Sequence, residues 1–210
     1  MKRTLKQQIL SKRNHLSKEE TNKKSILIKN NLYSLPEFKK AKNILFYVSF
    51  NSEVDTREII RELIIRKEKK VIVPYVEKNN PVLQLSELKN FNELEPKTFG
   101  ILEPKSSFIR EFNPNKLDLI IIPGAVFGLN GHRIGYGHGY YDRFLKTLEN
   151  SKGIFGVQKI FKKFSRKVKN NIKKIGLAYD FQVVDKIPEE QHDVPMDIII
   201  TDKEIMHCKK

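Results

Sequence analysis

A glycine-rich stretch from Gly128 to Gly139 contains the residues whose types and spacing could carry chemistry. Arg133 lies within it, and Asp142 follows shortly after. Five of the ten glycines in the chain lie there, at positions 128, 131, 135, 137 and 139. A guanidinium can bind phosphate oxygens through two parallel hydrogen bonds, and a carboxylate can bind Mg²⁺. These residue types favour a site for a phosphorylated ligand and its metal ion.

Each of these residues also has an ordinary structural explanation. The glycines form GxGxG and not the GxGxxG of dinucleotide-binding folds, and the chain has no GxxxxGK[ST] phosphate loop. A glycine cluster can be a plain turn, and the helix dipole favours an aspartate such as Asp142 in a first helical turn. Taken alone, the stretch leaves the turn and the phosphate site as equal alternatives.

Two predicted elements flank the glycine-rich stretch and would position it. The apolar run Leu119–Ile122 predicts a buried strand that Pro123 and Gly124 end. The segment Tyr140–Leu145 has the composition and the apolar face of a helix. A strand, a glycine loop and a helix in this order place free backbone N–H groups at a helix N-terminus, where an anion is stabilised.

The rest of the chain is predicted to alternate between helices and strands. Helices are predicted over residues 2–16, from the capping box of Ser17 and Glu20 to about Ser34, and from Asp55 onward. Strands are predicted at Ile44–Phe50, Val71–Pro74, Val82–Leu85, Ile175–Tyr179 and Ile198–Thr201. Strand–helix–strand units favour parallel pairing. Residues 1–210 are therefore predicted to form one α/β domain, with a mainly parallel, Rossmann-like sheet flanked by helices on both faces.

The composition favours a soluble globular protein. Hydrophobic residues make up 39% of the chain and charged residues 31%. The apolar runs are too short to cross a bilayer, and residues 1–13 lack the apolar core of a signal peptide. Cys208 is the single cysteine, so no internal disulfide can form. We expect a cytoplasmic protein without a membrane partner.

The chain is strongly basic, with 40 Lys and Arg residues against 25 Asp and Glu and a formal net charge of +15. Such a charge attracts polyanions, among them nucleic acids, nucleotides and acidic substrates. A lysine-rich solvated surface is the plainer interpretation, and it accounts for most of the charge.

The glycine-rich stretch and its flanks resemble the signature of the 5-formyltetrahydrofolate cyclo-ligase family, also called methenyltetrahydrofolate synthetase. The family pattern is roughly PGxxFDxxGxRxGxGxGYYDxxL, and residues 123–145 read PGAVFGLNGHRIGYGHGYYDRFL. Further matches follow in the expected order at Lys2–Lys6, Tyr47–Thr56 with Glu53, Gly100–Pro104, Ala178–Gln182, His192–Asp193 and Ile200–Asp202. The resemblance covers nearly the full chain.

The resemblance implies an α/β enzyme, monomeric or a weak homodimer, that acts on a folate. Members of the family use ATP and Mg²⁺ to close 5-formyltetrahydrofolate to 5,10-methenyltetrahydrofolate, with release of ADP and phosphate. The γ-phosphoryl group moves to the formyl oxygen and gives an iminium phosphate, and the N10 nitrogen then attacks the activated carbon. Such phosphoryl transfer needs positioning and charge neutralisation more than covalent help from the protein.

The family motif also assigns roles to residues of this chain. The implied ATP-binding residues are Lys2, Arg3, Lys6, Arg133, Ile134, Gly135, Tyr136, Gly137, His138, Gly139, Tyr140 and Tyr141. The implied folate-binding residues are Val48, Glu53, Tyr136, Gly137, His138, Gly139 and Tyr140. The implied magnesium ligands are Asp142 and Asp193, and the implied catalytic residues are Arg133, Tyr140 and Asp142.

The chain departs from the family pattern at two positions and in one segment. Lys6 stands where many members have arginine, and Gly128 stands where aspartate is usual. The segment 152–174 is longer and more basic than usual and has no acidic residue. It is predicted to be a solvated surface helix or, alternatively, a site that attracts the polyglutamate tail of cellular folates.

Two functions of other classes remain as alternatives. A folate-binding protein without turnover would sequester 5-formyltetrahydrofolate and hydrolyse no ATP. A basic nucleic-acid-binding module would retain the fold, but the chain lacks the aromatic and basic motifs of known modules. The side chains of His132, His138 and His192 are assigned no chemical role.

Overall fold

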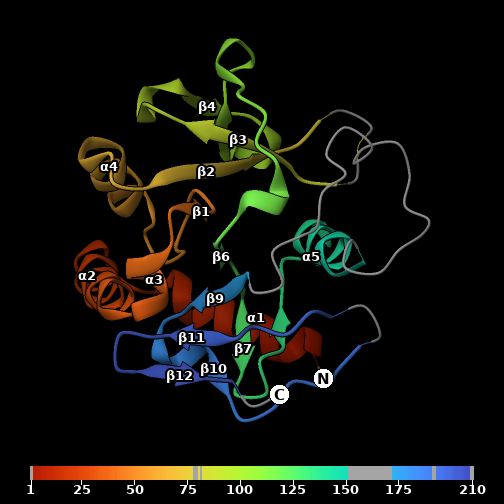
Figure 1. Ribbon diagram of the computed structural model, residues 1–210. Coiled ribbons are helices and arrows are strands. Elements are labelled where there is room, and N and C mark those ends of the chain that lie inside the picture. The colour runs from red at the N-terminus through yellow and green to blue at the C-terminus, as the bar shows by residue number, and fades with distance from the viewer. Residues whose placement is uncertain (1, 78–79, 81, 151–171, 191–192, 209–210) are drawn as a thin grey trace.

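The computed structural model describes residues 2–77, 80, 82–150, 172–190 and 193–208 (Figure 1). A seven-stranded sheet with the order β12-β11-β9-β6-β1-β2-β3 runs through it. These strands are β1 (Asn43–Leu45), β2 (Lys70–Tyr75), β3 (Gln84–Leu88), β6 (Leu119–Ile122), β9 (Lys173–Leu177), β11 (Ile198–Ile200) and β12 (Ile205–His207). The central strands run parallel, and only the edge strands β3 and β12 pair antiparallel. The predicted α/β fold with a mainly parallel sheet is confirmed.

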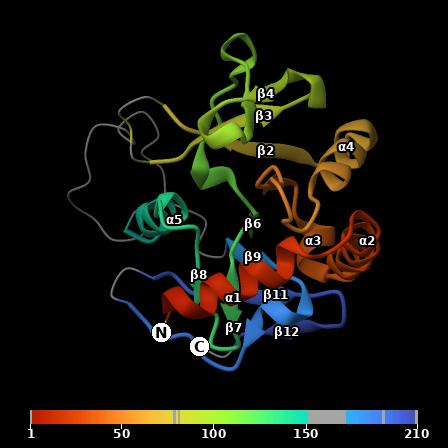
Figure 2. The ribbon, with the colours of Figure 1, turned by 180° about the vertical axis from the view of Figure 1, so that it is seen from behind.

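The two faces of the sheet build two hydrophobic cores under different helices (Figures 1 and 2). Ile44 and Leu119 point to the face that α2, α3 and α4 cover. Leu45 and Ile120, each the next residue along its strand, point to the opposite face, under α5. The helices are α1 (Lys2–Asn14), α2 (Lys18–Ser34), α3 (Pro36–Lys40), α4 (Arg57–Arg66) and α5 (Tyr140–Asn150). Helices therefore cover both faces, as predicted.

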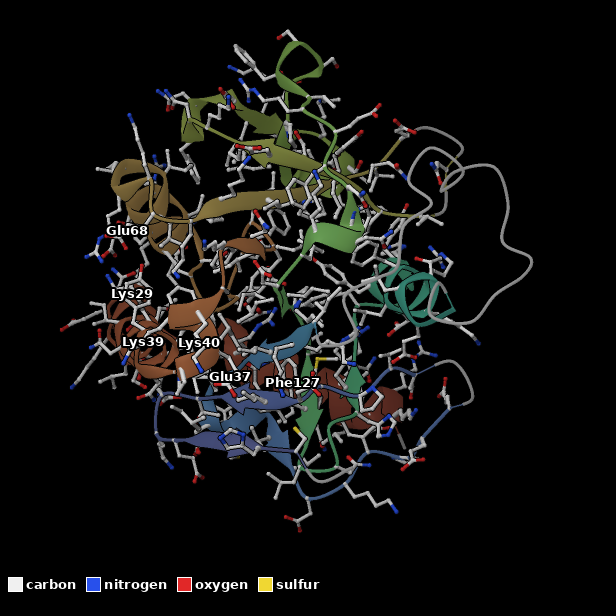
Figure 3. The ribbon with its side chains drawn as sticks, in the orientation of Figure 1. Lys29, Glu37, Lys39, Lys40, Glu68 and Phe127 are labelled. Atoms are coloured by element: carbon white, nitrogen blue, oxygen red, sulfur yellow. The ribbon has the colours of Figure 1, made fainter. Side chains whose placement is uncertain are left out.

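Phe127 occupies interior space that two glycines leave open. A Cβ atom at Gly124 would lie 2.7 Å from the Phe127 ring, and one at Gly176 would lie 2.5 Å from it. Core packing around Phe127 therefore requires these two glycines, and their presence needs no explanation from ligand binding. Figure 3 shows Phe127 inside the molecule, whereas the exposed Lys39 and Lys40 of α3 point to solvent.

Two smaller sheets extend the framework. The sheet β10-β7-β8 consists of β7 (Val126–Gly128), β8 (Arg133–Ile134) and β10 (Val183–Val184), and a hairpin consists of β4 (Leu94–Pro96) and β5 (Leu102–Pro104). Helix α1 packs on the first of these sheets, where Leu5 and Ile9 meet Ala125 and Val126. The N-terminal helix is thereby held beside β8, the strand that carries Arg133.

Two helix starts were predicted from capping residues, at Ser17 and at Asp55. The first is confirmed, and the second lies further along the chain. The Ser17 hydroxyl accepts the Glu20 N–H at 3.1 Å, and the Glu20 carboxylate accepts the Ser17 N–H at 2.9 Å, which completes the capping box. The helix predicted from Asp55 begins at Arg57 instead. Asp55 stays outside it and accepts the Arg57 N–H at 2.9 Å.

The strand predicted over Ile44–Phe50 is shorter than expected, because β1 ends at Leu45. Side chains beyond it accept the backbone N–H groups that a neighbouring strand would otherwise bind. Thr56 accepts the Ser49 N–H at 3.0 Å, and the Glu53 carboxylate accepts the Phe50 N–H at 2.9 Å. The residues after β1 therefore form a tight turn at the end of the sheet, and the turn carries Glu53.

The strand predicted at Leu119–Ile122 is confirmed with the same ends as β6, and the other predicted strands are confirmed with shifted ends as β2, β3, β9 and β11. The strand predicted at Val82 begins at Gln84, because the Val82 N–H is donated to Asn80 in a turn. Of the basic segment 152–174, residues 152–171 lie outside the described part of the chain, and Lys173 and Lys174 begin β9. Among the helices that the structure describes, none has the length and apolar character to cross a membrane.

The order of the strands creates a crevice at one end of the sheet. From β1 the chain proceeds to β2 and β3 on one side, and from β6 it proceeds to β9, β11 and β12 on the other. The connections therefore diverge at the carboxyl ends of β1 and β6. In open α/β sheets, such a divergence is the usual place for a ligand.

Candidate active site

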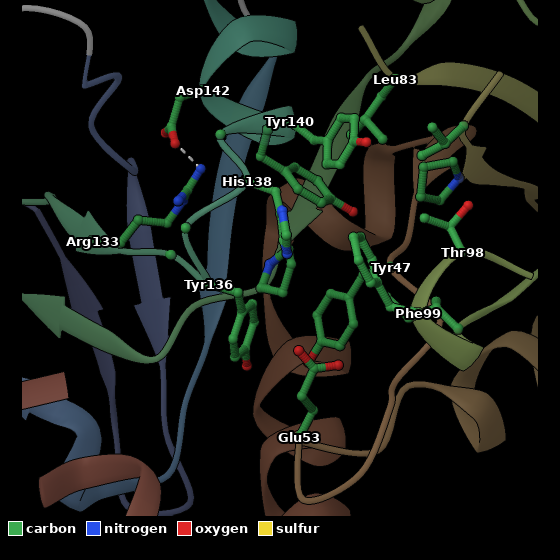
Figure 4. Close-up of a pocket in the computed structure, with 18 of the residues that line it drawn as sticks. Tyr47, Glu53, Leu83, Thr98, Phe99, Arg133, Tyr136, His138, Tyr140 and Asp142 are labelled. Carbon is green, nitrogen blue, oxygen red and sulfur yellow. Dashed lines mark hydrogen bonds and ion pairs between the residues drawn. The ribbon is translucent and has the colours of Figure 1, made fainter. Parts of the chain in front are cut away.

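A cavity of about 400 Å³ opens at the carboxyl ends of the parallel strands (Figure 4). Tyr47 and Val48 follow β1, Val76 follows β2 and Pro123 follows β6, and all four line the cavity. The glycine-rich stretch and the N-terminal helix complete its wall. The cavity thus occupies the point where the connections of the sheet diverge.

Nearly all the residues that the family motif singled out meet at this cavity. Its wall includes Lys2, Lys6, Val48, Glu53, Arg133, Ile134, Gly135, Tyr136, Gly137, His138, Gly139, Tyr140, Tyr141, Asp142 and Asp193. Arg3 is exposed on α1 and does not line the cavity. The fold therefore brings together residues from the beginning and the end of the sequence, from Lys2 to Asp193.

Arg133 and Asp142 form an ion pair at one end of the cavity. Arg133 Nη2 donates to Asp142 Oδ1 at 2.8 Å, from β8 to the first turn of α5 (Figure 4). The Arg133 side chain is only 4% exposed, whereas that of Asp142 is 32% exposed. Arg133 Nε is buried and has no hydrogen-bond partner among the described residues. The guanidinium therefore retains a donor for an anionic ligand.

The glycines between β8 and α5 permit a backbone that other residues would strain. Gly137 has φ +112° and Gly139 has φ +65°, and α5 begins directly after Gly139. A Cβ atom at Gly135 would lie 3.0 Å from Arg133 Nη1, so this glycine leaves room for the guanidinium. Arg143 donates to the His138 carbonyl at 2.9 Å and fastens the loop to the helix. The loop thus holds the N-terminus of α5 against the cavity, where the helix dipole favours an anion.

The opposite part of the cavity is lined by aromatic rings. Phe99 comes from the β4–β5 hairpin and stacks on His138 of the glycine loop, with ring centroids 4.4 Å apart and planes inclined by 23°. Phe99 is 59% exposed although it is large and apolar. Tyr47 and Tyr140 add further rings (Figure 4). An exposed ring on a cavity wall is suited to stack on a flat heterocycle.

Glu53 contributes a buried carboxylate to this aromatic part of the cavity. Burial raises its pKa above the ordinary value, while the Phe50 N–H, the Tyr136 hydroxyl and the charge of Arg13 act in the opposite direction. Burial also raises the pKa of Tyr141, whose hydroxyl is buried without a partner among the described residues. Glu53 can therefore accept, and Tyr141 can donate, hydrogen bonds with a ligand.

Lys2 and Lys6 bring positive charge from α1 to the cavity. Lys2 Nζ lies 2.7 Å from Glu190 and 3.8 Å from Asp193. Partial burial lowers the pKa of Lys6, whose ammonium lies 5.9 Å from the centroid of the Tyr136 ring. Both lysines are held at the cavity wall, with their ammonium groups in reach of an anionic ligand.

The two carboxylates predicted to bind magnesium both line the cavity. Asp142 is paired with Arg133, and Asp193 lies 3.8 Å from Lys2 and 3.8 Å from the buried His132. Within the described residues, no group of three or more His, Cys, Asp or Glu could hold a metal ion. Mg²⁺ usually takes one or two carboxylates and completes its shell with water and substrate phosphates. The donor set therefore fits a magnesium ion that arrives with a nucleotide, and does not form a closed protein site.

Sequence reasoning missed several residues of the cavity wall, among them Tyr47, Tyr75, Leu83, Thr98, Phe99 and Glu103. Among them, only Phe99 could have been suspected from the sequence. It is a large apolar residue next to a glycine in a predicted turn, where burial in the hydrophobic core is not expected. Its position depends on the β4–β5 hairpin, which was not predicted from the sequence.

Comparisons with known proteins agree on one family. The family model of the 5-formyltetrahydrofolate cyclo-ligase family matches residues 1–202. The 5-formyltetrahydrofolate cyclo-ligase of Haemophilus influenzae is 32% identical over 170 residues, which are 80% of each chain. A probable 5-formyltetrahydrofolate cyclo-ligase of Caenorhabditis elegans is 31% identical over 194 residues, which are 90% of this chain and 86% of the relative.

Solved structures give the same result. The 5,10-methenyltetrahydrofolate synthetase of Aquifex aeolicus superposes with a TM-score of 0.78 at 34% identity, over 100% of this chain and 93% of the other. The 5,10-methenyltetrahydrofolate synthetase of Mycoplasma pneumoniae superposes with a TM-score of 0.68 at 25% identity, over 96% of this chain and 98% of the other. The likeness therefore extends over nearly the full length of the chains compared.

Proposed function

The chain belongs to the 5-formyltetrahydrofolate cyclo-ligase family, and we propose that it uses ATP and Mg²⁺ to close 5-formyltetrahydrofolate to 5,10-methenyltetrahydrofolate. The products are ADP and phosphate, and the reaction takes place in the cytoplasm. One observation carries the proposal: a single cavity joins a cationic end, suited to phosphates, to an aromatic end that includes the Glu53 carboxylate. A reaction between a nucleotide and a folate needs both ends in one space.

The cationic end is proposed to bind the phosphates of ATP. Arg133 would offer the fork of its guanidinium, and the backbone of Gly135 to Gly139 would offer N–H groups at the start of α5. Lys2 and Lys6 would neutralise further charge from the opposite wall. Asp142 and Asp193 would hold Mg²⁺, which supplies charge neutralisation for the phosphates when bound.

The aromatic end is proposed to bind the pterin ring of the folate. Phe99 and Tyr140 would contact its faces, and the Glu53 carboxylate would accept its N–H groups. Val48 lies beside them at the end of β1 and would contact the ring edge. The glycine loop borders both ends of the cavity, so Tyr136 and Tyr140 lie where the two substrates would meet.

The proposed chemistry begins with the formyl oxygen. This oxygen attacks the γ-phosphorus of ATP, the bond to the ADP oxygen breaks, and an iminium phosphate forms on N5. The N10 nitrogen then attacks the formyl carbon and loses its proton, and the carbon–oxygen bond breaks as phosphate leaves. Arg133 contributes charge where the phosphoryl group moves, and the cavity holds the reacting atoms in contact.

The proposal is tested by mixing the protein with 5-formyltetrahydrofolate, ATP and magnesium and recording the near-ultraviolet absorbance. We expect the methenyl chromophore to appear only when all three components are present. Omission of ATP or addition of a chelator should abolish the signal. Binding of folate without a chromophore would favour a sequestering protein, and steeply salt-dependent binding of nucleic acid without turnover would favour a nucleic-acid module.

A further inference from the structure

Arg13 is the one buried residue of α1, with 5% of its surface exposed. A buried guanidinium is costly unless its N–H groups are satisfied. No carboxylate of the described residues lies within 4.0 Å of it in an ion pair. Its position therefore needs an explanation other than a salt bridge, and it does not line the cavity itself.

The partners of Arg13 belong to two segments that contribute residues to the cavity: Tyr136 lines it, and Ser52 precedes Glu53, which lines it. Arg13 Nη1 donates to the Tyr136 hydroxyl at 2.6 Å, and the guanidinium lies 5.5 Å from the centroid of that ring. Arg13 Nε donates to the Ser52 hydroxyl at 3.1 Å. Ser52 in turn donates to Asn14 at 2.5 Å, so the end of α1 is fastened to the turn that carries Glu53. One guanidinium thus joins the glycine loop to the Glu53 turn.

Arg13 also acts electrostatically on Glu53, because its positive charge favours the ionised carboxylate. Glu53 is held by the Phe50 N–H, and its carbonyl accepts the Tyr179 hydroxyl at 3.2 Å. The titratable groups that face its carboxylate are Tyr47, Tyr136 and Tyr141, which are neutral at physiological pH, and burial raises the pKa of each still further. Arg13 is the cation that opposes the effect of burial on the Glu53 pKa.

We propose that Arg13 is a positioning residue that fixes Tyr136 against the Glu53 turn and keeps Glu53 as a carboxylate. The proposal rests on the proposed function in one respect, since Glu53 is the group that would bind the folate. Through this arrangement, the buried end of α1 controls the folate end of the cavity, whereas its beginning contributes Lys2 and Lys6 to the nucleotide end.

The test uses Arg13→Gln, Arg13→Lys and the control Lys12→Gln, which removes an exposed cation from the same turn of α1. In Arg13→Gln we expect the KM for 5-formyltetrahydrofolate to rise at least about tenfold, as for loss of a charge-assisted contact, with the KM for ATP nearly unchanged. Without the cation, the Glu53 pKa rises further. Because the ionised form binds the folate, the acid limb of kcat/KM should move up by about one pH unit.

Arg13→Lys keeps the positive charge but loses the paired N–H donors of the guanidinium. The acid limb of its kcat/KM profile should therefore stay near that of the wild type, and its KM for 5-formyltetrahydrofolate should rise less than that of Arg13→Gln. An unchanged folate KM and an unchanged acid limb in folded Arg13→Gln would overturn the proposal, while turnover by the wild type would leave the proposed function standing. Carbon-13 NMR of labelled glutamate, assigned with Glu53→Gln, measures the Glu53 pKa without turnover. The same pKa in wild type and Arg13→Gln would also overturn it, even if the wild type proved inactive.

Discussion

Replacing Asp142 by asparagine is expected to lower kcat about 100- to 1000-fold, the usual cost of removing one group that organises transition-state charge. Asparagine keeps the shape of the side chain and removes its charge. The change leaves the buried Arg133 without its ionic partner and takes one of two proposed ligands from Mg²⁺. Steady-state rates of chromophore formation at saturating ATP and folate measure the effect.

The matched control is Glu149→Gln, which removes a carboxylate from the other end of the same helix. Glu149 does not line the cavity, so its variant should keep the wild-type rate. Thermal unfolding of both variants separates a catalytic loss from a folding defect, because a buried arginine without its partner also lowers the free energy of unfolding. A wild-type kcat in folded Asp142→Asn would remove Asp142 from the mechanism.

Replacing Glu53 by glutamine is expected to raise the KM for 5-formyltetrahydrofolate about 10- to 100-fold, the range for a lost hydrogen bond to a charged group. The KM for ATP should stay nearly constant, because Glu53 lies at the aromatic end of the cavity. Burial raises the Glu53 pKa, so the wild type loses the carboxylate, and with it folate affinity, as the pH falls through that raised value. The glutamine variant should lack this acid limb.

Initial rates over a range of pH, with each substrate varied in turn, measure both effects. Glu58→Gln is the matched control, because its carboxylate lies in the first turn of α4, is 73% exposed and does not line the cavity. Equal rises in both KM values would show that Glu53 supports the whole cavity. An unchanged folate KM together with a retained acid limb would mean that another group binds the pterin.

Local patterns were sufficient to predict the elements that surround the glycine loop. The apolar run Leu119–Ile122 is a fully buried strand, and Ser17 with Glu20 caps α2, because both depend on residues adjacent in sequence. The predicted strand Ile44–Phe50 is shorter in the structure, where β1 ends at Leu45, and the cause is again local. Thr56 and Glu53 bind the amides of that segment, and such competition by side chains leaves no periodic signal.

The candidate site was predictable where one motif contains the chemistry, as at Arg133 and Asp142. It was not predictable where the function of a residue depends on approach across the fold. Phe99 reaches the cavity because the β4–β5 hairpin places it against His138. Arg13 resembles any basic residue of a lysine-rich helix until the fold buries it beside Tyr136 and Ser52. The positions of these two residues beside the cavity follow from the three-dimensional arrangement of the chain.

In the proposed reaction, the γ-phosphoryl group of ATP moves to the formyl oxygen within this cavity. The most direct measurement uses 5-formyltetrahydrofolate labelled with oxygen-18 in the formyl group and follows the label by mass spectrometry of the released phosphate. We expect one labelled oxygen in each phosphate formed, because the carbon–oxygen bond breaks when phosphate leaves. Unlabelled phosphate, with the label released to water, would contradict it.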